Sequence, residues 1–189
     1  MSLYQIQSIF KKPKKIVLYE DGKGRQWAGD SCSAYRLYDI PFKVDHENIL
    51  DMLGVNDSQR KNYQYFDKVL PAVYLGDYGE SVDWQLPFIY DGEVYQVLRS
   101  GDEAICVMEH YLKPLKKFDR KDYRIEKVNG LRYLVVNHGA MPLAVICGEP
   151  VSADLARKLQ FTVDCLEQIA VPGEPNLFDK ETGEVFGDE

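Results

Sequence analysis

Short turns that contain glycine recur between strand-forming stretches, and this feature constrains the fold of the chain more than any other. Asp91-Gly92 lies within FIYDGEVYQVLRS (88–100), and Asn129-Gly130 lies within YRIEKVNGLRYLVVN (123–137). Both dipeptides suit type I′ turns, whose twist matches that of two antiparallel strands. Ser100-Gly101-Asp102 separates two further strand-like stretches. The pattern therefore predicts antiparallel meanders, not a parallel sheet.

The stretch YEDGKGRQWAGDS (19–31) holds three glycines and raises the question of a phosphate-binding loop. A dinucleotide-binding loop needs a third glycine where Trp27 stands. A P-loop needs Lys and then Ser or Thr after Gly29, where the chain has Asp30 and Ser31. We therefore interpret DGKG as a plain turn between the strand-forming stretches 16–20 and 25–28.

Four stretches have helical spacing of apolar residues or helix boundary residues. We expect helices at 46–54 with Asp45 as the cap, 58–70 with Pro71 as the end, 109–118, and 152–170 with Ser152 as the start. Two further strands are expected at 131–136 and at 141–147, the latter apolar on both faces. Strands and helices in this order predict an α+β fold of antiparallel sheets built from hairpins, with helices packed on one face.

Composition places limits on the class of protein. Apolar residues make up 45% of the 189, so a sizeable core can form. The net charge is −7, and residues 171–189 contribute most of it, with six acidic groups and one basic group. We expect one domain at 1–170, as a single body or as halves at 1–80 and 81–170, and a mobile acidic tail at 171–189.

The N-terminus lacks the features of a secretory signal, and no apolar run approaches the roughly 20 residues that span a bilayer. The four cysteines are far apart and form no C-x-x-C pair. We therefore expect a cytoplasmic protein with reduced thiols and no membrane partner.

Candidate catalytic groups have no motif around them. His46, His110 and His138 lack zinc-ligand spacing, and there is no G-x-S-x-G. Cys32 is a weak candidate for a nucleophile, because the neighbouring Asp30 would raise its pKa. We predict no catalytic residues, no metal and no cofactor, while a site assembled from distant Asp, Glu and His residues stays open.

Basic residues gather locally in this acidic chain. Lys11, Lys12, Lys14 and Lys15 form one group near the N-terminus. A solvated surface is the plain interpretation of any single group, but several together favour contact with a phosphate backbone. The predicted nucleic-acid-binding residues are Arg60, Lys61, Lys68, Lys113, Lys116, Lys117, Arg120 and Lys121.

Three segments resemble the bacterial and phage sliding DNA clamps, the processivity factors of replication. The likeness covers roughly residues 16–148. The strand, Asp-Gly turn and strand at 16–37, which run into WAGDSCSAYRLYDIP (27–41), look like a clamp strand pair that leads into a "TDG-hRL" segment, and GDEAICVMEHYLKPLKKF (101–118) resembles a strand feeding a "YL…L" helix. RYLVVNHGAMPLAVI (132–146) resembles the pair that ends in "YVVMPMR". The resemblance implies a non-enzymatic DNA-metabolism module whose basic helices face DNA, with 58–69 and 109–118 side by side.

The chain departs from that family in length, and Asn137 to Ala140 interrupt the final strand pair. A short, phage-like relative would either assemble into a ring or have lost ring formation. EPNLF (174–178) resembles the "QLxLF" peptide by which replication proteins dock onto a clamp, with Glu174 in place of Gln. This makes Leu177 and Phe178 the predicted partner-binding residues.

Three functional hypotheses follow. The first is the clamp-like module, with DNA and replication proteins as partners and a homo-oligomer as one outcome. The second is an acidic partner-binding or inhibitory protein of phage type. The third is a hydrolase, which requires a histidine within hydrogen-bond reach of a carboxylate in a deep pocket.

Overall fold

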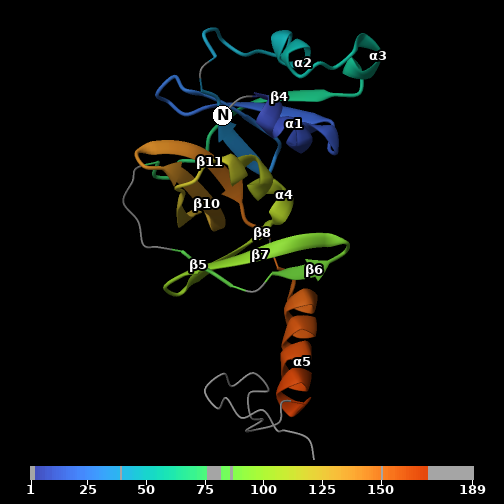
Figure 1. The fold of residues 1–189 in the computed structure, drawn as a ribbon, viewed down its shortest axis with the longest axis vertical. Coiled ribbons are helices and arrows are strands. Elements are labelled where there is room, and N and C mark those ends of the chain that lie inside the picture. Colours follow the sequence, from blue (N-terminus) through green and yellow to red (C-terminus); the bar gives the residue numbers. More distant parts are fainter. Residues whose placement is uncertain (1–2, 39, 76–81, 86, 150, 170–189) are drawn as a thin grey trace, which may run out of the picture. The chain divides into compact units, whose positions relative to one another are not determined.

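The computed structural model describes residues 3–38, 40–75, 82–85, 87–149 and 151–169 (Figure 1). The chain divides into two units, Met1–Pro150 and Val151–Glu189. The first unit is a mixed α+β body with two sheets, as the hairpin pattern predicts. The second unit contains one helix, α5 (Ala153–Ile169). The segment 171–189, with Leu177 and Phe178, lies outside the described residues.

The larger sheet has seven strands in the order β4-β1-β2-β3-β11-β10-β9. Its strands are β1 (Lys15–Glu20), β2 (Gln26–Gly29), β3 (Ser33–Arg36), β4 (Gln64–Val69), β9 (Asp122–Val128), β10 (Leu131–His138) and β11 (Met141–Cys147). All neighbours are antiparallel except β1 and β4, which run parallel.

The smaller sheet has four strands, in which β7 is central. Its strands are β5 (Asp83–Trp84), β6 (Phe88–Tyr90), β7 (Glu93–Ser100) and β8 (Glu103–Met108). Both β5 and β6 pair with β7, and β8 pairs with it as well, always antiparallel. The predicted meander between 88 and 108 is thus confirmed.

The Asp-Gly and Asn-Gly turns adopt the predicted conformation. Asp91 and Gly92 have φ values of 49° and 75°, and Asn129 and Gly130 have φ values of 51° and 81°. Positive φ at both central residues defines the type I′ turn. These local conformations set the register of the β6–β7 and β9–β10 hairpins.

The central strands of the larger sheet are covered on both faces, whereas β4 at its edge is mostly exposed. One face packs into the main core with α1 (Leu3–Lys11), and this core contains Ile6, Phe10, Ile16 and Tyr35. The other face holds a second cluster, in which Leu70 and Val73 cover Val17, Trp27 and Val135. Alternation of side chains along β1 explains the division, because Ile16 and Val17 point to opposite faces.

The helix expected at 58–70 is wrong. Only α3 (Asp57–Arg60) is helical there, and β4 follows it beside β1. Tyr65, Phe66 and Val69 favour strands, and the backbone N–H of Gln64 donates to the carbonyl of Lys14 at 2.9 Å. A long-range parallel pairing therefore overrides the local helical pattern.

The other expected helices differ in length or in kind. Helix α2 (Asn48–Met52) starts where Asp45 Oδ1 accepts the N–H of Glu47 at 3.0 Å and of Asn48 at 2.9 Å. The expected helix at 109–118 divides into α4 (Glu109–Leu112) and the 3₁₀ helix η1 (Lys113–Lys117). Pro114 lies at the start of η1, where a missing N–H costs no hydrogen bond.

Three elements of the first unit have no counterpart among the expected elements, namely α1, β3 and the two-residue strand β5. Ile6, Ile9 and Phe10 recur at helical spacing, so they lie on one face of α1. This face is buried in the core. Strand β3 joins the two halves of the larger sheet by pairing with β2 and β11.

Helix α5 of the second unit confirms the prediction for 152–170. Ser152 Oγ accepts the N–H of Leu155 at 3.1 Å, as an N-terminal cap does. Leu155, Leu159 and Val163 follow helical spacing along it. Among the described residues, no helix has the length and apolar character needed to cross a bilayer.

Candidate functional site

The predicted nucleic-acid-binding residues fall into two regions of the first unit. Helix α3 and strand β4 lie away from α4 and η1, so the two segments that clamp geometry would place side by side are apart (Figure 1). Arg60, Lys61 and Lys68 belong to the first region. The second region holds Lys113, Lys116, Lys117, Arg120 and Lys121.

The second region gains cations from the N-terminus. Lys12, which directly follows α1, forms an ion pair with Glu93 at the start of β7. The hydrogen bond and charge of Lys12, and more weakly the charge of Lys113, hold the pKa of Glu93 below its usual value. Lys12 therefore pairs directly with Glu93, whereas Lys113, about a hundred residues further along the chain, acts on this carboxylate through its charge alone.

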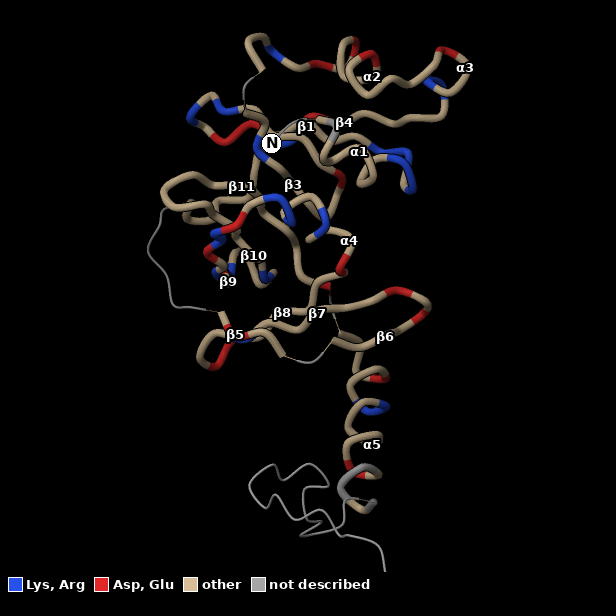
Figure 2. Tube along the Cα trace, in the orientation of Figure 1, with Lys and Arg blue, Asp and Glu red and all other residues tan. Residues whose placement is uncertain are grey.

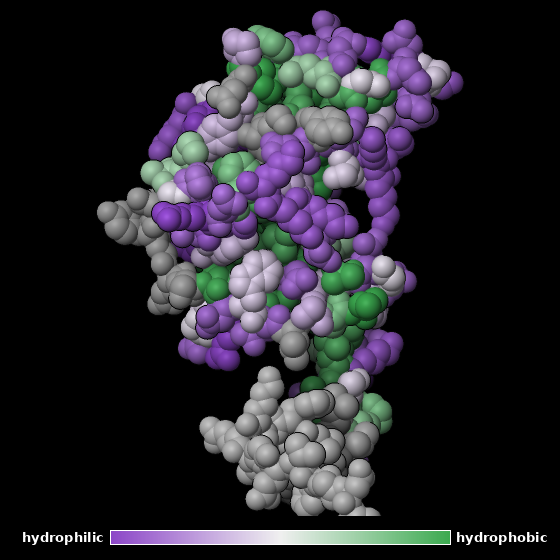
Figure 3. All heavy atoms as spheres, in the orientation of Figure 1, coloured by the Kyte–Doolittle hydropathy of each residue, from purple (hydrophilic) through white to green (hydrophobic). Residues whose placement is uncertain are grey.

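The remaining cations of this region are exposed with one exception. Lys116 Nζ lies 3.4 Å from Glu109 Oε1, whereas Lys113, Lys117 and Arg120 reach into solvent. Lys121 is half-buried and donates to the carbonyl of Phe118. Figure 2 shows the basic segments after α1 and in η1, and Figure 3 shows hydrophilic side chains across the face at the level of α4 and η1.

We name the set Lys11, Lys12, Lys113, Lys116, Lys117 and Arg120 the basic surface. The acidic side chains within it are Glu93, Glu109 and Asp119. The surface therefore keeps a positive excess, although the unit that carries it has 20 basic and 21 acidic residues. Sequence proximity shows the two lysine groups, but only folding brings Lys12 to Glu93 and places α4 against the same strand.

Arg60 of the other region has local partners, as do Lys14 and Lys15 beside it, whereas Lys61 and Lys68 are exposed. Arg60 Nε lies 2.9 Å from Asp57 Oδ1, and the guanidinium also pairs with Asp51. Lys14 and Lys15 lie over the rings of Tyr63 and Phe66, at 5.0 and 4.8 Å from the ring centroids. Ion pairing and ring contacts occupy these cations in part, so they are a weaker candidate for a phosphate-binding surface.

A groove of about 1130 Å³ lies between the ends of β1, β2 and β4 and the segment 40–47. Gln26 holds this segment on the sheet, because its Nε2 donates to the carbonyl of Phe42 at 2.9 Å and its Oε1 accepts the N–H of Val44 at 2.5 Å. The groove has apolar walls, from Leu18, Leu37 and Phe42 among others, and a charged rim.

A histidine and a carboxylate meet at the rim of this groove. His46 Nε2 lies 3.2 Å from Asp67 Oδ1, and the imidazole stacks on Tyr65 with ring centroids 5.1 Å apart. The two side chains are 39% and 76% exposed. No Ser, Thr or Cys occurs among the described lining residues of the groove. The pair meets the distance that the hydrolase hypothesis requires, but it faces solvent instead of a closed pocket.

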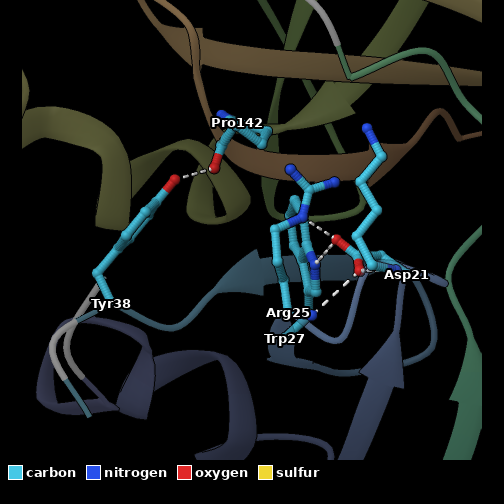
Figure 4. Close-up of polar contacts among 6 residues, drawn as sticks. Asp21, Arg25, Trp27, Tyr38 and Pro142 are labelled. Atoms are coloured by element: carbon cyan, nitrogen blue, oxygen red, sulfur yellow. Dashed lines mark hydrogen bonds and ion pairs between the residues drawn. The ribbon is translucent and has the colours of Figure 1, made fainter. Parts of the chain in front are cut away.

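The glycine-bearing turn at 21–24 is closed by its own aspartate (Figure 4). Asp21 Oδ1 accepts the N–H of Lys23 at 2.9 Å, and Oδ2 accepts the indole N–H of Trp27 at 3.0 Å and pairs with Arg25. Burial raises the pKa of Asp21, but these hydrogen bonds outweigh burial and hold the pKa below its usual value. Because a carboxylate already occupies the backbone N–H groups, this turn does not offer them to a phosphate.

Asp30 forms a second polar centre, and it is only 5% exposed. Its Oδ1 accepts the N–H groups of Cys32 and Ser33 at 2.9 and 2.8 Å and the hydroxyl of Ser33 at 2.9 Å. Its Oδ2 accepts the hydroxyl of Tyr111 at 3.0 Å. Beyond its mismatch to a P-loop and its proximity to Cys32, Asp30 begins Asp-Ser-Cys-Ser, a typical Asx-turn pattern that predicts these local bonds. These donors satisfy the carboxylate, so Asp30 is a structural residue.

The cysteines and the other histidines have no catalytic arrangement. Burial, with Asp30 as the next cause, raises the pKa of the Cys32 thiol, and burial raises the pKa of Cys106 to about 11. His138 Nδ1 lies 2.6 Å from the carbonyl of Arg120, and burial lowers the pKa of His110. Within the described part of the chain, no three His, Cys, Asp or Glu side chains are placed to hold a metal ion.

The basic surface is therefore the candidate site. It consists of positively charged residues that are distant in sequence. Comparison of the chain with protein-family models, with curated proteins and with solved structures finds no match in any of the three.

Proposed function

We propose that the first unit binds the phosphate backbone of nucleic acid through the basic surface, without catalysing a reaction. The observation that carries this proposal is the ion pair from Lys12 to Glu93 in β7, because α4, which directly precedes the lysines of η1, contacts the same strand. Lysine ammonium groups on flexible stems suit phosphate oxygens at varied positions, and they do not read bases. The expected binding is therefore independent of sequence.

The proposal sets the size of the salt effect. Each phosphate that a protein neutralises on duplex DNA contributes about −0.9 to the slope of log K against log salt concentration. If four cations of the basic surface contact phosphates, the slope is about −3.6. Affinity would then fall about 150-fold between 50 and 200 mM salt.

A clamp-like role is the finer form of this proposal. The resemblance of residues 27–41, 101–118 and 132–146 to sliding clamps supports it, as does the position of the lysines in η1, directly after α4. In that role replication proteins would be the partners, and Leu177 and Phe178 would be a docking motif. Backbone binding does not depend on this finer form.

Fluorescence anisotropy with a labelled 30-base-pair duplex at 50 and 200 mM salt tests the proposal. The test variant replaces Lys113, Lys116 and Lys117 by Gln. The control variant replaces Lys23, Lys43 and Lys127 by Gln, which removes the same charge from exposed positions elsewhere. We expect the test variant to bind at least tenfold more weakly with a shallower salt slope, and the control to retain most of its affinity. Equal losses in both variants, or no binding by the wild type at 50 mM salt, would overturn the proposal.

A further inference from the structure

Strand β4 is an outer strand of the larger sheet, and its pairing determines which backbone groups are free. The N–H of Gln64 donates to the carbonyl of Lys14 at 2.9 Å, and the N–H of Leu70 donates to that of Glu20 at 2.8 Å. Backbone groups alternate in direction along a strand, so the even-numbered residues of β4 face β1. The N–H and C=O groups of Tyr65, Asp67 and Val69 therefore point away from the sheet.

The described part of the structure provides no partner for this edge. None of its backbone hydrogen bonds outside regular strands involves the N–H or C=O of Tyr65, Asp67 or Val69. The side chains are also open, with Phe66 39% and Val69 80% exposed. The outer strand of the smaller sheet differs, because the N–H of Glu149 donates to the carbonyl of Cys106 in β8 at 2.7 Å.

A six-residue edge without proline or a bulge is a template for another strand. Its sequence, QYFDKV, decides which strand fits. A second β4 related by a two-fold axis would run antiparallel to the first, and hydrogen bonds form only where outward-facing residues stand opposite each other. In each such register, the residue on the two-fold axis then lies opposite the same residue of the other copy.

Charge selects among these registers. Centring the pair on Asp67 or on Lys68 places like charges directly opposite each other, which destabilises a strand pair. Centring it on Phe66 places Tyr65 opposite Asp67 and Gln64 opposite Lys68 of the other copy. In that register, residue 65 of one copy and residue 67 of the other exchange backbone hydrogen bonds. The two Phe66 residues form a non-hydrogen-bonded pair at the axis, where the strands approach most closely and the two rings can touch.

We propose that the protein forms a two-fold symmetric dimer in which β4 pairs antiparallel with β4 of a second copy, with Phe66 opposite Phe66. The larger sheets of the two copies then continue into one another through this edge. The proposal rests on the geometry of β4 and is independent of the nucleic-acid function.

The dimer is expected to be weak. A single pair of strands buries less than the roughly 1,200 Å² of a stable interface. Four backbone hydrogen bonds between residues 65 and 67 and one aromatic pair provide its specificity. Self-association is therefore expected in the micromolar range or above, with a concentration dependence that a monomer would not show.

Sedimentation equilibrium between 5 and 500 μM tests the association. Phe66→Arg places two like charges at the axis and is expected to weaken dimerisation at least tenfold. Ile89→Arg is the control, because Ile89 is 76% exposed in β6 and lies outside the interface. A wild type that stays monomeric at 500 μM overturns the proposal, and so does equal weakening by both variants.

Oxidative cross-linking tests the register. Cysteines at position 66 of both copies would be about 4.5 Å apart at Cα, which fits a disulfide. Phe66→Cys is therefore expected to give a covalent dimer on oxidation, above the background of the wild type with its own four cysteines. Lys68→Cys is the matched control on the same face, and its two thiols would lie too far apart. Preferential cross-linking of Lys68→Cys would overturn the Phe66-centred register.

Discussion

The hydroxyl of Tyr111 donates a hydrogen bond of 3.0 Å to Oδ2 of Asp30, and both residues are buried. Asp30 directly follows β2 of the larger sheet, whereas Tyr111 lies in α4, which follows the smaller sheet. The hydroxyl of Tyr35 in β3 also donates to the carbonyl of Tyr111 at 2.7 Å. These bonds attach α4, and with it the lysines of η1, to the larger sheet.

Tyr111→Phe is expected to lower the free energy of unfolding by about 1–3 kcal/mol, because a buried carboxylate would lose one of its donors. Burial and the charge of Asp30 raise the pKa of Tyr111, so its hydroxyl keeps the proton that it donates. Urea denaturation followed by circular dichroism measures the change. Tyr90→Phe, at an exposed position, is the control and should be neutral. An unchanged stability of Tyr111→Phe would contradict the structural role of this bond.

Gly29→Ala is expected to destabilise the protein by about 3 kcal/mol or more, since overpacking against rigid backbone has no easy relief. A Cβ at position 29 would lie 1.8 Å from the carbonyl oxygen of Ser33. Gly22→Ala is the comparison, because a Cβ there meets nothing within 4 Å, although its φ of +68° costs about 1–2 kcal/mol. Thermal melts of both variants separate the steric overlap from the cost of positive φ. Similar melting temperatures would contradict the close approach.

Asp21→Asn is expected to destabilise the protein at pH 7 by about 1.5–3 kcal/mol, the range for hydrogen bonds to a charged group. The folded state lowers the pKa of Asp21, so the ionised form stabilises the fold at pH values above the ordinary value of 3.8. This stabilisation is lost as the pH falls through the lower folded-state pKa. Denaturation curves from pH 2.5 to 7 should therefore show the difference between wild type and variant shrinking below about pH 4. A difference that grows on acidification would disprove the assignment.

Glu93→Gln is expected to strengthen nucleic-acid binding severalfold at most, because it releases Lys12 from an exposed ion pair, and such pairs are weak. Anisotropy titrations with duplex DNA at 50 mM salt measure the effect. Glu103→Gln is the control, since Glu103 pairs with Arg132 outside the basic surface. Weaker binding by Glu93→Gln would argue against a role for Lys12 in the surface.

Much of the fold could be predicted because it depends on local chemistry. Asp91-Gly92 and Asn129-Gly130 require positive φ, and that requirement gave two hairpins of the correct type. Ser152 and the spacing of Leu155, Leu159 and Val163 located α5. The segment 58–70 was predicted wrongly, because its apolar residues fit helical spacing as well as strand alternation.

For the candidate site too, some features could be predicted from the sequence and others depend on the fold. The lysines near residues 113–117 and near the N-terminus are evident in the sequence, but the ion pair from Lys12 to Glu93 and the contact of α4 with β7 depend on the tertiary fold. The aspartates at positions 21 and 30 have short-range partners that a closer analysis of the turns would find. The bond from Tyr111 to Asp30 spans 81 residues and has no local sequence pattern.

Local residue preferences were sufficient for the turns, the antiparallel hairpins, the helix after Ser152 and the α+β class, because these follow from the conformational preferences of neighbouring residues. Packing of the whole chain was needed to make residues 64–69 an edge strand parallel to β1 and to bring Lys12 to Glu93 in β7. Both relationships depend on the burial of a common core by segments far apart in the chain, and hydrophobic burial is not directional enough for a local pattern to specify its partner.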